Sequence, residues 1–282
     1  MSFLPLSQQG DHVFIKEEQA REKAKALSQA YKAAEPFAHC VIDNFLPEEI
    51  TERLLKEFPV ITDREMKRSQ EIFKGLCLPD QLPQSAAWAR GVFYSFNSLP
   101  FIAFLEELTG IKGLIPDPYF MGGGFHETLS GGRLGIHADF NIHQKLRLRR
   151  RINVLVYLNH DWKPEWGGEL ELWTKDMKTK AKSVAPLFNR CVIFDTDDTS
   201  WHGHPDPMTC PLDRSRKSIA LYYYTASDAI FSENKVDTTN FRVRSGSGDK
   251  TDLVMRSKYF LRDLIPPVLL RGMLWIKAAL KS

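Results

Sequence analysis

The sequence predicts a mainly β protein of sandwich or barrel type with flanking helices, and three observations support this prediction. Between about residues 113 and 225, short runs rich in β-branched and aromatic residues alternate with Gly, Asp, Asn and Pro, as in proteins built from many short strands. Two segments upstream repeat apolar residues at helical spacing instead. Hydrophobic residues make up 43% and charged residues 26% of the 282 positions, a balance that allows a sizeable core.

Three helices and one strand are expected before the β-rich region. Residues 17–34 are rich in Ala and Lys and predict a polar surface helix, whereas the apolar run 37–46 predicts a strand. A second helix is expected to begin at Pro47, because proline suits a first helical turn, and to continue through apolar residues at helical spacing. Ser98 is expected to cap a third helix that ends at Gly110.

The clearest strands of the β-rich region are residues 152–158, 169–173, 190–194 and 218–225. Side chains alternate between the two faces of a strand, so Asn153, Leu155 and Tyr157 share one face of the first of these strands. Its other face carries Val154, Val156 and Leu158, which indicates packing against apolar neighbours. The sequence contains no internal repeat.

The chain is expected to have three parts. Residues 1–35 form an N-terminal helical extension, residues 36–230 the main domain, and residues 231–282 a polar loop followed by a C-terminal helical segment. This last segment is apolar with scattered Arg and Lys, so contact with a membrane surface is the alternative to the favoured packing on its own domain. No stretch reaches the roughly 18 uninterrupted apolar residues of a membrane span. The sequence leaves the oligomeric state open.

Charge and cysteine content give expectations about partners and location. A formal charge of +3 is too close to balance to indicate a nucleic-acid partner. The first residues lack a basic region followed by a long apolar run, so no signal peptide is expected. The four cysteines are scattered without the spacing of a metal site. Reduced thiols in a cytoplasmic protein are the simplest explanation.

The strongest chemical signal is the pair His137 and Asp139. Two residues apart on a strand, the imidazole and the carboxylate share a face and can reach one metal ion. A histidine from a distant strand would complete a set of two imidazoles and one carboxylate, which suits Fe(II) with open positions for oxygen chemistry. His202 is the candidate and His204 its rival. A chance His-x-Asp in a turn is the alternative explanation of the first pair.

A second signal is the pair Arg216 and Ser218, which begin a predicted strand and alternate onto the same face. A buried arginine needs an anionic partner, and its planar fork matches a carboxylate. The neighbouring hydroxyl adds another donor, and a salt bridge to a nearby Asp is the alternative. Tyr157 offers a further hydroxyl donor, unless it is a core tyrosine with one satisfied hydrogen bond.

Other motifs carry less information. The basic run 145–151, KLRLRRR, is interpreted as a solvated loop, and its alternative role is to steer an anionic substrate. The run 121–124, MGGG, is not a phosphate loop, because no Gly-Lys-Ser/Thr follows it. No Ser or Cys stands in a recognisable nucleophile elbow.

Several stretches together resemble the Fe(II)- and 2-oxoglutarate-dependent dioxygenases, and among them the prolyl-hydroxylase-like branch. In chain order they are PFAHCVIDNFLPEEITERLLKEFP (36–59), SGGRLGIHADFN (130–141), RRINVLVYLNHDWKPEWGGELELW (150–173), and CVIFDTDDTSWHGHPDP with RSRKSIALYYYT (191–207 and 214–225). The resemblance runs from Phe37 to about Thr225. It implies a double-stranded β-helix core of jelly-roll or cupin-like type with flanking helices, so that residues 36–230 form the dioxygenase domain.

The resemblance also implies a metal centre. His137, Asp139 and His202 would be the catalytic metal ligands and would bind Fe(II). His202 is preferred because it opens the His-x-x-x-x-Pro pattern that ends at Pro207, and His204 is the alternative. Related halogenases lack the carboxylate ligand, so the presence of Asp139 points to hydroxylation.

2-Oxoglutarate is the co-substrate that the resemblance implies. Arg216 would bind its far carboxylate with the help of Ser218, and Tyr157, which precedes the Leu-Asn pair shared with the family, would reach the same group. Asn153 matches a polar position beside the co-substrate. The spacing before Arg216 is slightly longer than expected for the family, which leaves Arg214 as an alternative.

The activity implied by the resemblance is hydroxylation of an unactivated C–H bond in a small molecule or a peptidyl residue. Succinate and CO2 would be released, and ascorbate would play a supporting role. Two other classes remain alternatives: a metal-dependent isomerase or hydrolase on a cupin-like barrel, and a non-catalytic jelly-roll binding module. The Arg-x-Ser pair at Arg216 and Ser218 disfavours the first, and the complete set of three metal ligands disfavours the second.

Overall fold

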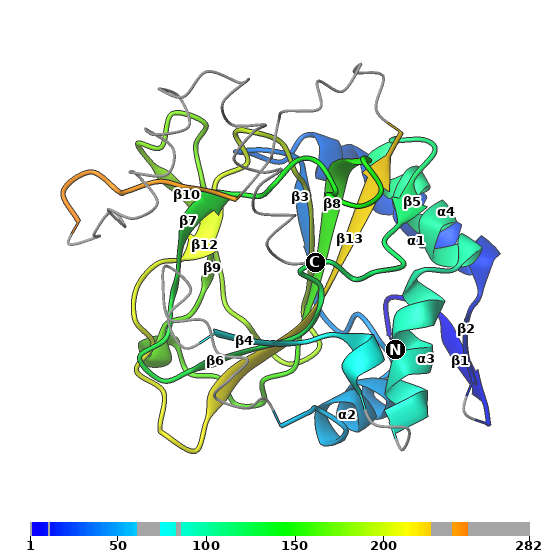
Figure 1. Cartoon of the computed structure of the whole chain (residues 1–282). Helices are drawn as coiled ribbons and strands as arrows, with labels where there is room; N and C mark the ends of the chain where they lie inside the picture. Colours follow the sequence, from blue (N-terminus) through cyan, green and yellow to red (C-terminus); the bar gives the residue numbers. More distant parts are fainter. Residues whose placement is uncertain (1, 11, 61–73, 83–85, 227–238, 248–282) are drawn as a thin grey trace, which may run out of the picture.

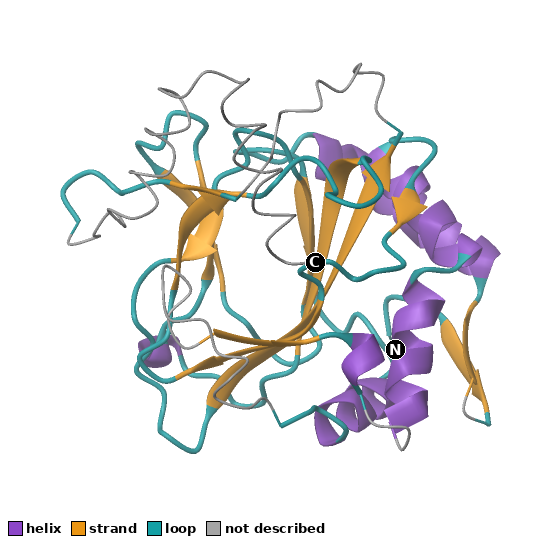
Figure 2. Cartoon of the chain, viewed as in Figure 1, coloured by secondary structure: helices purple, strands orange, loops and turns teal. Residues whose placement is uncertain are grey.

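The computed structural model describes residues 2–10, 12–60, 74–82, 86–226 and 239–247. These residues form two antiparallel sheets that face each other across a cavity, with helices packed on the outer side of the larger sheet (Figures 1 and 2). The expected mainly β architecture with flanking helices is confirmed.

The larger sheet has the strand order β3-β11-β8-β13-β6-β4, and β5 pairs with one end of β13. Its strands are β3 (His39–Ile42), β4 (Lys74–Cys77), β5 (Ile115–Pro116), β6 (Gly124–Leu129), β8 (Arg149–Tyr157), β11 (Cys191–Asp195) and β13 (Ser215–Thr225). Three of the four clearest predicted strands are found here as β8, β11 and β13. Val154 and Val156 of β8 lie in the main hydrophobic core, as the alternation predicted.

The smaller sheet has the order β10-β9-β12-β7-β14. Its strands are β7 (Leu134–Ala138), β9 (Leu170–Trp173), β10 (Lys180–Val184), β12 (His202–His204) and β14 (Asn240–Phe241). The predicted strand at 169–173 is found as β9. A separate N-terminal hairpin of β1 (Leu6–Gln9) and β2 (His12–Ile15) was not predicted.

The four α-helices of the described residues are α1 (Glu17–Lys32), α2 (Glu48–Lys56), α3 (Ala87–Phe96) and α4 (Leu99–Thr109), and short 3-10 turns lie at η1 (Pro79–Gln81) and η3 (Pro164–Trp166). The three predicted helices are α1, α2 and α4, whereas α3 was not predicted. Helix α1 is less superficial than expected, because Ala20, Ala24 and Tyr31 are buried.

Two local details differ from the prediction. The strand expected at 37–46 is limited to His39–Ile42, and Asn44 just beyond it adopts a left-handed φ of 50° that cannot continue an extended strand. Ser98 stands at the N-cap position of α4, but its hydroxyl donates to the Ser95 carbonyl (2.5 Å) and does not cap the helix. Gly110 ends the helix in the left-handed region at φ 79°, as expected.

The main hydrophobic core lies between the larger sheet and the helices. Leu4 and Ala20 from the first 35 residues belong to the same cluster as Phe101, Phe125 and Val154, so the N-terminal part packs on the main domain. The proposed three-part division of the chain stays a prediction. All four cysteines are unpaired.

The expected C-terminal helical segment lies outside the described residues, and with it the alternative of membrane contact. Only the short stretch 239–247 of the last part is described, and it contributes β14 to the smaller sheet. Within the described ranges, no helix has both the length and the apolar character needed to cross a membrane.

Candidate metal centre and co-substrate pocket

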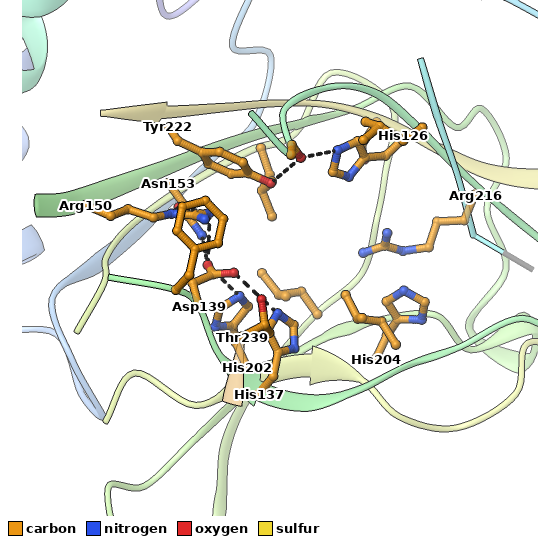
Figure 3. A pocket seen from close by; sticks show the side chains of 17 residues that line it. His126, His137, Asp139, Arg150, Asn153, His202, His204, Arg216, Tyr222 and Thr239 are labelled. Carbon is orange, nitrogen blue, oxygen red and sulfur yellow. Dashed lines mark hydrogen bonds and ion pairs between the residues drawn. The ribbon is translucent and has the colours of Figure 1, made fainter. Parts of the chain in front are cut away.

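Two neighbouring strands of the smaller sheet bring the predicted metal ligands together. His137 on β7 and His202 on β12 are direct partners in the antiparallel register, and Asp139 follows the end of β7. Gly203 allows this close pairing, because a Cβ there would approach the carbonyl oxygen of Gly135 to 2.7 Å. Figure 3 shows the three side chains converging on one point of the cavity.

The geometry of this group suits a metal ion. One ligand atom from each of His137, Asp139 and His202 lies within 4.8 Å of the others. The Nε2 atoms of His137 and His202 lie 3.6 and 3.5 Å from the two carboxylate oxygens of Asp139. Their Nδ1 atoms face the carbonyl oxygens of Gly135 (2.8 Å) and Ser200 (2.9 Å). Donation from Nδ1–H to these carbonyls leaves each Nε2 lone pair directed at the metal position.

The electrostatics of the group also favour metal binding at neutral pH. Burial lowers the pKa of His202 to about 4, with a further contribution from His137, so its imidazole is neutral and able to coordinate. Burial alone would raise the pKa of the Asp139 carboxyl, but the charge of Arg150 beside it holds that pKa well below its usual range. Asp139 is therefore a carboxylate.

Aromatic rings flank the two histidines and limit their rotation. The ring of Phe194 lies 4.8 Å from that of His202, and the ring of Phe241 lies 5.2 Å from that of His137. Phe241 belongs to β14, which pairs with β7 directly at His137. Phe194 belongs to β11 of the larger sheet, so one ring from each sheet flanks the two histidines.

His204 does not belong to the metal group. The pairing of β12 with β7 is irregular between His202 and His204, so that His204 opposes Leu134. Its side chain lies beside Arg216 at the other end of the cavity (Figure 3). The geometry therefore favours His202 over its rival.

Arg216 lies at the far end of the same cavity, which has a volume of about 140 Å³. Its guanidinium donates from Nε to the Gly168 carbonyl (2.7 Å) and from Nη2 to the Tyr157 hydroxyl (3.1 Å). Among the described residues it has no carboxylate partner. Burial lowers its pKa below the ordinary value, although Tyr157 opposes the shift. A buried cation in this state calls for an anionic ligand.

The other predicted co-substrate residues are placed differently from one another. Ser218 is buried and lines the cavity two positions along β13 from Arg216. Tyr157 is fully buried and does not line the cavity; it contacts Arg216 and so acts on the guanidinium. Asn153 lines the cavity but is engaged by Asp139 and Arg150.

Arg214 is exposed and lines a different surface pocket, so the geometry favours Arg216 as the anion-binding residue. The Gly-Gly turn before β9 helps to place Arg216. Gly168 adopts a φ of +73°, and its carbonyl accepts the bond from the Arg216 Nε. A Cβ at Gly168 would lie 3.1 Å from the Arg216 Cδ and 2.6 Å from the Met208 Sδ.

The interpretation of the basic run 145–151 as a solvated loop is wrong for Arg150. This residue is only 1% exposed and lines the cavity. Simple alternation would put it on the packed face with Ile152, but the pairing of β8 with β13 shifts so that Ile152 and Arg150 oppose the adjacent residues Tyr223 and Tyr224. This bulge turns Arg150 toward the cavity, and no sequence signal marks it.

Sequence reasoning also missed three residues with ring side chains at the cavity wall. They are His126, Phe140 and Tyr222. The Tyr222 hydroxyl donates to the Gly122 carbonyl (2.9 Å), and His126 Nε2 lies 2.9 Å from the same oxygen. Tyr222 does alternate onto the face of Arg216 and Ser218, and this was the available signal.

Comparison with known proteins identifies the domain. Residues 123–224 match the family model described as the 2OG-Fe(II) oxygenase superfamily. This part of the chain is similar to the 2OG-Fe(II) oxygenases. The resemblance seen in the sequence is thereby confirmed. The match spans the strands that hold His137, Asp139 and His202 and the strand of Arg216.

A curated relative is the prolyl 3-hydroxylase OGFOD1 of Mus musculus, which is 26% identical over 202 residues. The aligned part covers 68% of this chain but 34% of the relative, so the chain spans about a third of the length of that relative.

Two solved structures share the fold. One is a prolyl hydroxylase from Trichoplax adhaerens in complex with a hypoxia-inducible factor peptide fragment (TM-score 0.52, 18% identity, 73% of this chain and 91% of that one). The other is a prolyl 4-hydroxylase from Phytophthora capsici (TM-score 0.52, 17% identity, 88% and 75%). The expected double-stranded β-helix core is confirmed.

The residues present fit the cofactors that the superfamily name carries. Two imidazoles and one carboxylate form the donor set that suits Fe(II) with open positions. A buried arginine without an anionic partner among the described residues suits the far carboxylate of 2-oxoglutarate. Fe(II) and 2-oxoglutarate are therefore the cofactor and co-substrate of this domain.

Proposed function

We propose that this chain is an Fe(II)- and 2-oxoglutarate-dependent dioxygenase that hydroxylates an unactivated C–H bond. One observation carries the proposal: His137, Asp139 and His202 converge at one end of a cavity whose other end holds Arg216 without an anionic partner among the described residues. A dicarboxylate chelated at the metal end and paired with a cation at the far end fits this arrangement.

Each residue has a defined task in this function. His137, Asp139 and His202 would hold Fe(II) on one face and leave the opposite positions open. When bound, the iron would supply the chemistry by which O2 places one oxygen atom in a C–H bond and the other in succinate, as 2-oxoglutarate loses CO2. Arg216 would fix the far carboxylate of 2-oxoglutarate, and Ser218 would add a hydroxyl donor beside it.

The cavity wall would protect the reaction from water. Leu134, Leu155 and Leu170 are apolar residues of the cavity wall. An apolar wall strengthens the pairing of Arg216 with a carboxylate, because water competes less for both groups. Tyr157 would orient the Arg216 guanidinium from behind through its hydroxyl.

We further propose that the substrate is a prolyl residue of a peptide. The name of the mouse relative, a prolyl 3-hydroxylase, and the peptide bound to the Trichoplax enzyme support this choice over a free small molecule. The aromatic rings of Phe140 and Tyr222 offer an apolar surface for a pyrrolidine ring at the cavity wall.

The test is a turnover screen on the full chain. Succinate release is measured with Fe(II), 2-oxoglutarate and ascorbate across proline-containing peptides and a panel of small metabolites. We expect a proline peptide to raise succinate release and to gain the mass of one oxygen. His137→Ala should abolish both signals. Equal succinate release by His137→Ala and the unaltered chain would contradict the proposed metal centre. If only a small metabolite is hydroxylated, the proposal of a peptide substrate is wrong.

The same assay separates the alternative classes. Product formation without 2-oxoglutarate would favour a metal-dependent isomerase or hydrolase. Metal binding with no turnover on any substrate would favour a binding module. We also propose a cytoplasmic location, supported by four cysteines that form no disulfide, and no nucleic-acid partner. Fractionation of cells that express the tagged chain tests the location.

A further inference from the structure

The carboxylate of Asp139 is held by two residues outside the proposed ligand set. Its Oδ2 atom accepts a hydrogen bond from Asn153 Nδ2 (2.7 Å) and lies 3.0 Å from Arg150 Nη2. The Oδ1 atom has neither of these partners. The two oxygens of one ligand are thus unequal before any metal binds.

Arg150 and Asn153 are themselves tied to each other. The Nε and Nη2 atoms of Arg150 donate to Asn153 Oδ1 at 2.9 and 2.7 Å. With the two bonds to Asp139, these contacts form a closed ring of three side chains (Figure 3). The ring also fixes the orientation of the Asn153 amide, because only its oxygen can accept from the guanidinium.

Aromatic side chains hold the guanidinium in this position. The Arg150 guanidinium carbon lies 3.5 Å from the centroid of the Tyr222 ring and 4.7 Å from that of Phe140. A planar guanidinium stacks well on such rings, whereas a lysine ammonium lacks this geometry. The residue is nearly fully buried, so it is a fixed part of the site rather than a mobile surface cation.

We infer that Arg150 and Asn153 are positioning residues that reserve Asp139 Oδ2 and present Oδ1 to the metal, so that Asp139 coordinates through one oxygen. A carboxylate that used both oxygens would occupy a position that 2-oxoglutarate needs. The inference rests on the metal centre of the proposed function and adds residues that the ligand set does not contain. It also reassigns Asn153 from a co-substrate contact to a support of the ligand.

Arg150 could act by positioning Asp139 or only through its charge. The direction in which the metal dissociation constant changes when Arg150 is replaced distinguishes these two explanations. Removing a cation beside a metal-binding carboxylate should tighten the binding of a divalent ion by Coulomb attraction alone. Loss of a group that orients a ligand instead weakens metal binding, by about 10- to 100-fold in typical cases. The two explanations therefore predict opposite changes in the dissociation constant.

The experiment is titration of the full chain with Mn(II) by calorimetry, without 2-oxoglutarate or turnover. We expect Arg150→Gln to raise the Mn(II) dissociation constant by about 10- to 100-fold, and Arg150→Lys to fall between the variant and the unaltered chain. Arg149→Gln is the matched control, because Arg149 is an exposed neighbour with the same charge. Its dissociation constant should equal that of the unaltered chain.

A second variant covers the case in which Arg150→Gln does not fold. Asn153→Ala keeps the Arg150–Asp139 ion pair but opens the ring, and we expect it to weaken Mn(II) binding as well. An unchanged or lower dissociation constant in whichever variants fold, judged by thermal unfolding, would overturn the inference. Failure of the unaltered chain to bind Mn(II) would instead count against the metal centre of the proposed function.

Discussion

Arg150 and Arg216 lie at the wall of one cavity and are almost equally buried, at 1% and 7% exposure, but their charges are balanced differently. Arg150 faces the carboxylate of Asp139 at 3.0 Å. Arg216 faces only a carbonyl and a hydroxyl among the described residues. A buried charge that the protein balances is part of its framework, whereas one that it leaves unbalanced marks where an anion binds.

The comparison assigns different roles to the two sheets. The smaller sheet carries the proposed metal ligands His137 on β7 and His202 on β12, and the larger sheet carries both arginines, on β8 and β13. At the metal end of the cavity, the charge of Arg150 is thus already balanced by Asp139 before any ligand binds. In the proposed function, the carboxylate of the co-substrate supplies the missing counter-charge of Arg216.

The largest effect is expected from Asp139→Ala. Succinate release should fall to background, because the metal loses a ligand. The metal-free variant should also lose about 3 kcal/mol of unfolding free energy, because Arg150 is left buried without its carboxylate. Urea unfolding measures the stability, and the exposed Asp213→Ala is the control. If Asp139→Ala is as stable as the unaltered chain, Arg150 does not depend on Asp139 for its charge balance, and the proposed difference between the two arginines is wrong.

Arg216→Ala is expected to affect 2-oxoglutarate binding strongly and the stability of the ligand-free chain less than Asp139→Ala does. The dissociation constant for 2-oxoglutarate, measured by calorimetry on the Mn(II)-loaded chain, should rise about 100-fold, because a buried charge pair with the ligand is lost. The ligand-free stability should fall less than in Asp139→Ala, because no described anion loses its partner. The exposed Arg214→Ala should bind 2-oxoglutarate normally. If Arg214→Ala weakens 2-oxoglutarate binding and Arg216→Ala does not, Arg214 is the residue that binds the far carboxylate.

Gly168→Ala should weaken 2-oxoglutarate binding less than Arg216→Ala does. The new Cβ would meet Met208 Sδ at 2.6 Å and Arg216 Cδ at 3.1 Å, and it would displace the guanidinium. Backbone strain at a φ of +73° should also cost about 1 to 3 kcal/mol of stability. Gly167→Ala is a close control, because its φ is +67° but a Cβ there meets nothing within 4 Å. Equal 2-oxoglutarate affinity in both variants would show that this contact does not place Arg216.

Tyr157→Phe should give the smallest effect. It removes one acceptor from the Arg216 guanidinium, a hydrogen bond to a charged group. We expect the 2-oxoglutarate dissociation constant to rise by roughly threefold to tenfold. Tyr223→Phe is the control, because its hydroxyl donates to the Phe96 carbonyl (3.0 Å) away from the cavity. A larger effect in Tyr223→Phe would mean that core packing, rather than orientation of Arg216, controls affinity.

Much of this fold and site could be predicted because their signals are local in the sequence. Alternation along residues 152–158 predicted the buried face of β8, and the left-handed end of α4 follows from a single glycine at Gly110. The hairpin β1–β2 and helix α3 were not predicted, because their burial depends on packing against distant segments.

The sequence by itself determined the kinds of ligand present: His137, Asp139 and a later histidine for a metal, and an arginine at the start of a strand for a carboxylate. Only the tertiary structure favours His202 over His204, because the choice depends on the pairing register of two strands. The structure alone also showed that a bulge turns Arg150 from a basic run onto Asp139. Residue type sets what a side chain can bind, but register and backbone irregularities set where it points.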